Sequence, residues 1–175
     1  DPCDPRSAYG AGKRAAEMLC TIHARQFGID IVTARIFALL GPLLPLDTHF
    51  AAGNFIRDAM AGRPIRVLGS GRAVRSYLYA ADLCIWMWTL AIAGPAGSTY
   101  NVGSEHGVSI AELAECTARV LNAPGVEILG QDDPGWNPGR YVPSTGAIRH
   151  ALNLGATIDL DTAIRRTAIA NGWTP

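Results

Sequence analysis

The segment SAYGAGKRAAE, residues 7–17, carries a tyrosine and a lysine four positions apart, Tyr9 and Lys13. On a helix, residues i and i+4 share a face and lie about 6 Å apart, so both side chains point the same way. A free tyrosine has a pKa near ~10, and a neighbouring ammonium group lowers such a value because it favours the phenolate. A tyrosine tuned in this way can exchange a proton with a hydroxyl or carbonyl group. The spacing therefore predicts a proton-transfer pair.

Two other interpretations of this segment compete with proton transfer. The first is an amphipathic helix with a buried Tyr9 and a surface Lys13, because this spacing is frequent by chance. The second is a phosphate-binding loop, which requires glycine in place of Ser7 and Ser or Thr in place of Arg14. The sequence meets neither of these two requirements of a phosphate-binding loop.

Two further features of the segment favour a functional role. Lys13 is the only lysine of the chain, and the other basic residues are arginines. Lysine offers a compact ammonium group where arginine offers a planar fork, although chance in an arginine-rich sequence is the alternative explanation. Gly10 and Gly12 together cost a helix roughly 2 kcal/mol relative to alanine, so we expect a compensating role such as the close approach of a ligand.

The composition argues against several classes of protein. The chain has 175 residues, 49% of them apolar, and a formal net charge of zero, which fits a globular domain and not a nucleic-acid-binding protein. The longest apolar run, residues 83–93, is too short to cross a bilayer. We therefore expect no membrane partner and a buried helix, with Trp86, Met87 and Trp88 in the core.

Cysteine and histidine spacing limits the chemistry further. The four cysteines form no CxxC pair, and the four histidines show no metal-ligand spacing. The sequence therefore predicts reduced thiols, no metal site and a cytoplasmic location.

Apolar periodicity and turn residues predict alternating helices and strands, which is typical of an α/β fold. Ser7 is the expected N-cap of the first helix and Gly28 its end. Ser109 and Glu112 have the spacing of a capping box, and Asp82 is expected to cap the helix that follows it. Expected helices cover about 8–27, 50–61, 81–93, 109–121, 145–152 and 161–171; expected strands lie within 29–37, 64–71, 75–80, 99–103 and 126–129.

Five segments resemble, in the same order, segments of the extended short-chain dehydrogenase/reductase family of NAD(P)-dependent sugar-nucleotide epimerases and dehydratases. The first is similar to the family's SPYAASKLAAE-like helix, and the third ends in the family's R-x-Y-x-Y-x-x-D pattern. Together they extend over nearly the whole chain. The segments are SAYGAGKRAAE (7–17), ARIFALLGP (34–42), residues 54–83, STYNVGSEHGVSIAELAE (98–115) and GRYVPSTGAIRHALNLG (139–155).

The resemblance implies an enzyme that oxidises a sugar at C4 with NAD, with NADP as the alternative cofactor. Tyr9 matches the catalytic base that takes the hydroxyl proton. Lys13 matches the residue that binds the nicotinamide ribose and lowers the tyrosine pKa, and Phe37 falls in a cofactor-contacting segment. The 4-keto sugar formed in this family is either reduced from the other face, in 4-epimerases, or first loses water, in 4,6-dehydratases.

The resemblance also assigns residues to a nucleotide-diphosphate sugar. Arg75 and Arg140 match arginines that grip the diphosphate, and a guanidinium fork suits phosphate oxygens. Asn54 and Val67 match positions that contact the nucleotide sugar and base. The family often has asparagine where Ala38 stands, which puts one usual substrate contact in doubt.

The resemblance implies the C-terminal part of a Rossmann-like doubly wound parallel sheet plus a smaller α/β substrate-binding domain. We expect residues 1–48 to end the dinucleotide-binding domain and residues 49–175 to form mainly the substrate-binding domain, with about 75–100 returning to the first. A complete dinucleotide-binding fold opens with a strand and a glycine-rich turn, which this sequence lacks. The chain alone is therefore expected to be inactive.

Three functions stay open at this point. The first is half of a sugar-nucleotide 4,6-dehydratase or 4-epimerase. The second is a reductase of a substrate without a diphosphate. The third is a non-catalytic binding or dimerisation module, since in the family the helix with Tyr9 and Lys13 packs in a homodimer interface, where Met18 and Ile22 are candidate contacts.

Overall fold

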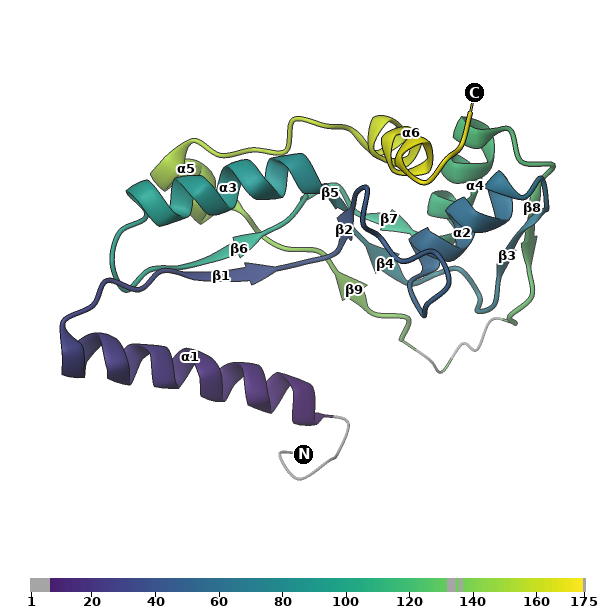
Figure 1. Cartoon of the computed structure of the whole chain (residues 1–175). Helices are drawn as coiled ribbons and strands as arrows, with labels where there is room; N and C mark the ends of the chain where they lie inside the picture. Colours follow the sequence, from purple (N-terminus) through teal and green to yellow (C-terminus); the bar gives the residue numbers. More distant parts are fainter. Residues whose placement is uncertain (1–6, 132–134, 136, 175) are drawn as a thin grey trace.

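Helices and short parallel strand pairs alternate along the chain, as the sequence predicts for an α/β protein. Figure 1 shows the computed structural model, in which residues 7–131, 135 and 137–174 are described. The helices in this part of the chain are α1 (Ala8–Phe27), α2 (Ala51–Met60), α3 (Ala80–Ala93), α4 (Ile110–Leu121), α5 (Gly146–Leu152) and α6 (Leu160–Ala170). The strands are β1 (Thr33–Ile36), β2 (Leu39–Leu40), β3 (Ile65–Val67), β4 (Val74–Arg75), β5 (Leu78–Tyr79), β6 (Thr99–Val102), β7 (Val108–Ser109), β8 (Val126–Ile128) and β9 (Arg140–Tyr141).

The strands form small sheets in which parallel pairing dominates. Strand β1 pairs with β6, β2 with β5 and β3 with β8, all parallel. Strand β4 is central in a three-stranded sheet, parallel to β9 and antiparallel to β7. Parallel partners must be joined by long crossovers, and helices α2, α3 and α4 lie within these connections.

One hydrophobic cluster lies between the β1–β6 pair and helices α3 and α5. Trp86 and Leu90 of α3 belong to it together with Tyr100 and Val102 of β6 and Ile148 of α5. Figure 1 shows α3 and α5 on one face of this strand pair and α1 on the other.

A second, larger cluster holds α2, α4 and α6 against β3. Ile56, Ile65, Leu113 and Ile164 form its centre, and each is 0% exposed. Full burial of one such side chain contributes about 1.5–3 kcal/mol to folding. The two clusters lie in different parts of the molecule. The domain boundary expected from the sequence after residue 48 stays a prediction.

The predicted helix ends are partly confirmed. The Ser109 hydroxyl accepts a hydrogen bond from the Glu112 N–H at 3.1 Å, and the Glu112 carboxylate accepts one from the Ser109 N–H at 2.7 Å. This confirms the capping box at the start of α4, and the backbone hydrogen bond from Ser109 holds the pKa of Glu112 below its usual value. Gly28 ends α1 in the left-handed region with φ 63°, as predicted, whereas the N-cap Ser7 makes no capping hydrogen bond.

The strands differ from the expectation in their bounds. The strand expected over 29–37 is reduced to Thr33–Ile36 and is not buried, since Ile36 is 44% exposed. Within the described residues β1 pairs on one edge only, with β6. The strand expected over 75–80 is split between β4 and β5, and β9 lies in a segment expected to be loop.

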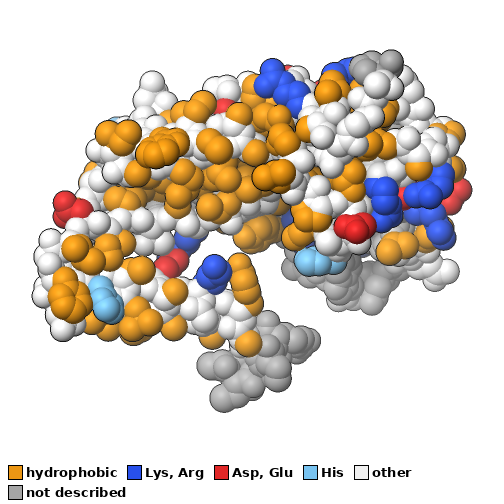
Figure 2. Space-filling model, viewed as in Figure 1, with side chains coloured by type: hydrophobic (Ala, Val, Ile, Leu, Met, Phe, Trp, Pro, Cys, Tyr) orange, Lys and Arg blue, Asp and Glu red, His pale blue; other side chains and the backbone are white. Residues whose placement is uncertain are grey.

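Helix α3 exposes side chains that the sequence places in the core. Trp86 is 1% exposed as expected, but Trp88 is 70% and Met87 is 39% exposed. Ile85 and Ile92 are also exposed, and Figure 2 shows apolar side chains gathered over the part of the surface where α3 lies. A helix that is apolar on all sides is normally buried on all sides, so α3 lacks a covering layer here. No helix in the described ranges has both the length and the apolarity that a bilayer span requires.

Asp82 does not cap α3, because it lies inside the first turn and Tyr79 holds the N-cap position. Its carboxylate, which is 2% exposed, accepts hydrogen bonds from the backbone N–H groups of Thr157 and Ile158 at 3.0 and 3.1 Å. The Thr157 hydroxyl donates a third at 2.5 Å. Asp82 therefore ties the start of α3 to the segment between α5 and α6.

We predict that Asp82→Asn lowers the free energy of unfolding by about 2 kcal/mol, because the amide keeps one acceptor oxygen where the two N–H groups share Oδ2 and the Thr157 hydroxyl donates to Oδ1. Urea denaturation followed by tryptophan fluorescence measures the change. Asp30→Asn, in the exposed loop before β1, is the matched control and should leave stability unaltered. Equal midpoints for the two variants would contradict this role of Asp82.

Candidate functional site

Tyr9 and Lys13 lie on one face of α1, as their spacing predicts. The Lys13 Nζ is 5.6 Å from the centroid of the Tyr9 ring. Tyr9 is 78% exposed, so the alternative of a buried core tyrosine does not hold for this chain. A Cβ atom built on Gly10 or Gly12 would meet nothing within 4 Å, so the helix surface beside the pair is open to a ligand.

A salt bridge holds α1 beside the sheet. The Glu17 carboxylate accepts hydrogen bonds from Arg35 Nε at 2.7 Å and from Arg35 Nη2 at 2.6 Å. Arg35 lies in β1, and Figure 1 shows the N-terminal end of α1 on the same side of the molecule as the carboxyl end of this strand. The hydrogen bond from Arg35 also keeps the pKa of Glu17 below its usual value. The pair thus ties the middle of α1 to β1.

Phe37 directly follows β1, at the same end of the strand. Its backbone N–H donates to the Val102 carbonyl at 2.9 Å. Its ring stacks on Tyr141, with centroids 4.5 Å apart and an interplanar angle of 25°. In open α/β sheets ligands bind outside the carboxyl ends of parallel strands, which is where Phe37 lies.

Asn54 and Val67 line one cavity of about 700 Å³ between α2 and the β3–β8 pair. Asn54 projects from α2, and Val67 is the last residue of β3 and is 2% exposed. The structure therefore brings these two predicted residues together, although they are far apart in the sequence.

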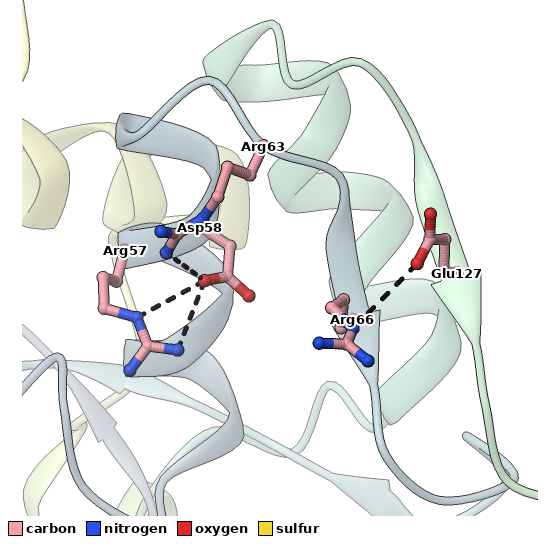
Figure 3. Close-up of polar contacts among 5 residues, drawn as sticks. All are labelled: Arg57, Asp58, Arg63, Arg66 and Glu127. Atoms are coloured by element: carbon pink, nitrogen blue, oxygen red, sulfur yellow. Dashed lines mark hydrogen bonds and ion pairs between the residues drawn. The ribbon is translucent and has the colours of Figure 1, made fainter.

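The same cavity has charged residues that the sequence analysis did not single out. Arg57 donates from Nε and Nη2 to Asp58 Oδ1 at 3.3 and 3.2 Å, and Arg63 Nη2 donates to the same oxygen at 2.9 Å (Figure 3). Asp58 is only 7% exposed. Arg57 and Asp58 lie three and four residues after Asn54, so helical spacing would have placed them on the same face of α2.

The β3–β8 side of the cavity contributes further polar groups and ends in a close main-chain contact. Arg66 and Glu127 face each other across β3 and β8 at 4.0 Å (Figure 3). The Ser70 hydroxyl, which also lines the cavity, is buried and has no hydrogen-bond partner among the described residues. Just after β3 and β8, Gly130 donates to the Gly69 carbonyl at 3.3 Å, and a Cβ on Gly130 would lie 2.3 Å from the Gly69 carbonyl carbon.

Arg75 and Arg140 lie on neighbouring strands but do not converge. Strand β4 pairs with β9 so that Arg75 is opposite Tyr141 and Val74 is opposite Arg140. Because successive side chains of a strand alternate between faces, this register puts the two arginines on opposite faces. Arg75 Nη1 donates to its neighbouring Val74 carbonyl at 2.8 Å and to the Gly139 carbonyl at 3.4 Å.

A second cavity, of about 880 Å³, is lined by none of the predicted site residues. Burial raises the pKa of its Tyr77 to about 12, and burial with the Asp161 carboxylate raises the pKa of Cys116 to about 12. Both groups are therefore protonated at neutral pH and are poor nucleophiles. In the described part of the chain no cluster of His, Cys, Asp and Glu could hold a metal ion.

Comparison with known proteins gives a family match and a fold match. The sequence model described as "NAD dependent epimerase/dehydratase family" matches residues 1–103. A UDP-glucuronic acid decarboxylase 5 of Arabidopsis thaliana is 35% identical over 152 residues, which cover 87% of this chain and 44% of the relative. A probable dTDP-glucose 4,6-dehydratase of Sinorhizobium fredii is 28% identical over 189 residues, which cover 98% of this chain and 51% of the relative.

Among solved structures, UDP-glucose 4-epimerase of Thermotoga maritima has a TM-score of 0.83 at 18% identity over 93% of this chain and 52% of that protein. The enzyme WbmF of Bordetella bronchiseptica, solved with NAD⁺ and UDP, has a TM-score of 0.83 at 22% identity over 98% of this chain and 54% of that protein. These matches establish the fold. The chain spans about half the length of the relatives it matches.

We predict that Glu17→Gln loosens α1 at neutral pH, because it removes the charge that Arg35 binds. Hydrogen exchange of the α1 amides should rise severalfold, while Glu115→Gln, on the exposed side of α4, should leave them unchanged. The pKa of Glu17 is lowered in the folded state, so its stabilising contribution exists at neutral pH and is lost as the pH falls below about 4.5 through that lowered value. The variant should therefore lack this acid-induced loosening once intrinsic exchange rates are corrected for. Unchanged α1 exchange in Glu17→Gln would show that the salt bridge does not hold the helix.

Proposed function

Because the chain belongs to the NAD dependent epimerase/dehydratase family, we propose that it forms the second half of an NAD-dependent enzyme that modifies a nucleotide-diphosphate sugar. The names of three of the matched proteins contain such a sugar: UDP-glucuronic acid, dTDP-glucose and UDP-glucose. The observation that carries the proposal is the Tyr9–Lys13 pair, which is exposed on α1 at the end of the fold where ligands of parallel sheets bind.

In the proposed mechanism Tyr9 is the general base. Its phenolate oxygen accepts the proton of the sugar C4 hydroxyl, and the bound NAD supplies the hydride acceptor. The Lys13 ammonium group stabilises the phenolate by its charge and donates hydrogen bonds to the ribose of the cofactor. The open surface beside Gly10 and Gly12 fits such a close approach, and Phe37 limits the site on the β1 side.

The nucleotide end of the substrate lies, in this proposal, in the cavity lined by Asn54 and Val67. The chain continues from the cavity through Gly71 and Ala73 to Arg75, which is the proposed diphosphate ligand. Arg140 lies on the other face of the β4–β9 pair, so its contact with the same diphosphate requires a different side-chain conformation.

The exposed apolar surfaces support the proposal that activity needs a second, dinucleotide-binding half of the protein. Strand β1 is paired on one edge only within the described residues, and Ile85, Trp88 and Ile92 of α3 are exposed beside it. Strands and helices of a dinucleotide-binding half would continue this sheet and cover these side chains. The glycine-rich NAD-binding turn would come from that half, so the chain by itself is inactive.

Three reactions fit the proposal: 4,6-dehydration, 4-epimerisation, and the decarboxylation that the names of several curated relatives add. NAD is the proposed nicotinamide cofactor, with NADP as the alternative, and the proposed location is the cytoplasm. A reductase of a substrate without a diphosphate is a weaker alternative, since its substrate would leave the polar cavity unused.

A dimer contact through α1 is part of the proposal. The exposure of this helix also favours a purely structural module as the second candidate function. The helix has no buried residue, and its apolar side chains Met18, Leu19, Ile22 and Phe27 are exposed. A second copy that packs against α1 would bury these side chains in a homodimer.

We predict that the 175-residue chain alone does not reduce NAD⁺ in the presence of UDP-sugars or dTDP-glucose. The same chain joined to an upstream dinucleotide-binding half should do so, and Tyr9→Phe in that longer protein should lower kcat by about 100-fold or more, because the phenol oxygen is lost while the ring remains. Absorbance at 340 nm follows the reaction. Full activity of Tyr9→Phe would exclude Tyr9 as the base.

We predict that Arg75→Ala weakens UDP binding to the chain by at least about tenfold, which corresponds to about 1.4 kcal/mol, because a charge-assisted contact with the diphosphate is lost. Calorimetric titration with UDP measures the change. Arg25→Ala, in the last turn of α1, is the control. Arg140→Ala should have a smaller effect than Arg75→Ala, and the reverse order would assign the diphosphate to the other face of the β4–β9 pair.

A further inference from the structure

The loop between β6 and β7, residues 103–107, lies against the segment that leads from β9 into α5, residues 140–145. Figure 1 shows the chain running from β9 alongside β6 to α5, and the Asn101 side chain of β6 donates from Nδ2 to the Ser144 carbonyl at 3.1 Å. The 140–145 segment begins with an arginine and a tyrosine of the candidate site. Any group that holds this segment in place therefore also decides where those two side chains lie.

Glu105, in the middle of the 103–107 loop, uses both carboxylate oxygens on the far end of the segment. Its Oε1 accepts a hydrogen bond from the Thr145 N–H at 2.7 Å, and its Oε2 accepts one from Arg149 Nη2. The Thr145 N–H is also the main reason that the pKa of Glu105 lies below its usual value.

The bond to Thr145 is the stronger of these two anchors. Thr145 directly precedes α5 and is only 4% exposed, whereas Glu105 and Arg149 form an ion pair that is largely open to solvent. A buried N–H that loses its acceptor costs the desolvation of that group, while an exposed ion pair contributes little. The Glu105 carboxylate therefore fixes the segment mainly through its backbone.

Glycines at both ends of the loop allow its close approach. A Cβ on Gly103 would lie 2.8 Å from Pro143 Cγ and 3.0 Å from Phe37 Cβ. A Cβ on Gly107 would lie 3.1 Å from both terminal nitrogens of Arg140. These distances are shorter than ordinary van der Waals contact, so the main chain of the loop packs directly on these side chains.

The segment held in this way supplies one ring of the aromatic stack at the carboxyl end of β1. Tyr141 stacks on Phe37 with ring centroids 4.5 Å apart, although Tyr141 is 47% exposed. Burial holds a half-exposed ring only weakly, because much of its apolar surface stays in water. The stack therefore depends on the groups that fix the backbone around Tyr141.

We infer that Glu105 is a positioning residue, which accepts the Thr145 N–H and so keeps Tyr141 stacked on Phe37 and the backbone of Arg140 in place before a substrate binds. Glu105 itself touches neither substrate nor cofactor in this scheme. Ordering the segment in advance removes an entropic cost from binding. The inference rests on the proposed function, because the substrate assigned to Arg140 is the nucleotide-diphosphate sugar.

Glu105→Ala in the 175-residue chain tests the anchor directly. Nuclear Overhauser effects between the ring protons of Phe37 and Tyr141 should fall severalfold in this variant. Glu105→Gln should retain them, since its amide oxygen still accepts the Thr145 N–H, and Arg149→Ala should retain them because it removes only the exposed ion pair. Unchanged effects in Glu105→Ala overturn the inference. Should this variant not fold, Glu105→Asp, whose carboxylate is one methylene shorter, takes its place with the same expected loss.

In the longer protein that includes the dinucleotide-binding half, kinetic constants separate positioning from stability. Glu105→Ala should raise KM for the sugar nucleotide at least about fivefold and change kcat less than about twofold, because the cost of ordering the segment is met when the substrate binds. A purely structural role predicts the reverse, since a smaller folded fraction lowers the apparent kcat and leaves KM unchanged. Glu115→Ala, on the exposed side of α4, is the matched control and should alter neither constant. A fall in kcat at constant KM would contradict the positioning role.

The two experiments also separate the inference from the proposed function. If the longer protein turns over no sugar nucleotide while Glu105→Ala loosens the aromatic stack, the proposed function fails and the hold of Glu105 on Tyr141 is confirmed. If turnover is found and the stack survives Glu105→Ala, the inference fails and the enzyme half remains.

Discussion

The parallel pairing of β1 with β6 is the constraint on which the rest of the site depends. Parallel sheets are normally covered by helices on both faces, and here α3 and α5 lie on one face while α1 is held on the other by the Glu17–Arg35 salt bridge. The same pairing fixes the carboxyl end of β1, and therefore Phe37, at the height of the Tyr9 end of α1. The geometry proposed for catalysis therefore depends on the same strand pairing that builds this part of the sheet.

Local patterns predicted most of the helices, because helix boundaries are set by nearby residues. The capping box of Ser109 and Glu112 and the left-handed Gly28 each act within one turn, so the sequence alone identifies them. Burial is different, because it depends on what lies across the helix. The run 83–93 is apolar on all sides, and no local signal shows that Trp86 faces a strand pair while Trp88 faces solvent.

Part of the candidate site was predictable from the sequence, and part was not. Helical spacing was sufficient for Tyr9 and Lys13, because both lie on one element. The charged group on Asp58 was not singled out, since arginines next to an aspartate are common on exposed helices, and only its burial distinguishes this one. The relation of Arg75 to Arg140 depends on the register between two short strands that are far apart in sequence, which local reasoning cannot supply.

The contact between Gly69 and Gly130 has a consequence for how the β3–β8 pair can vary. Main-chain atoms meet just after the two parallel strands end, and a Cβ on Gly130 would lie 2.3 Å from the Gly69 carbonyl carbon. Any larger residue at Gly130 would therefore push the two strands apart, so this parallel pair requires glycine at that position.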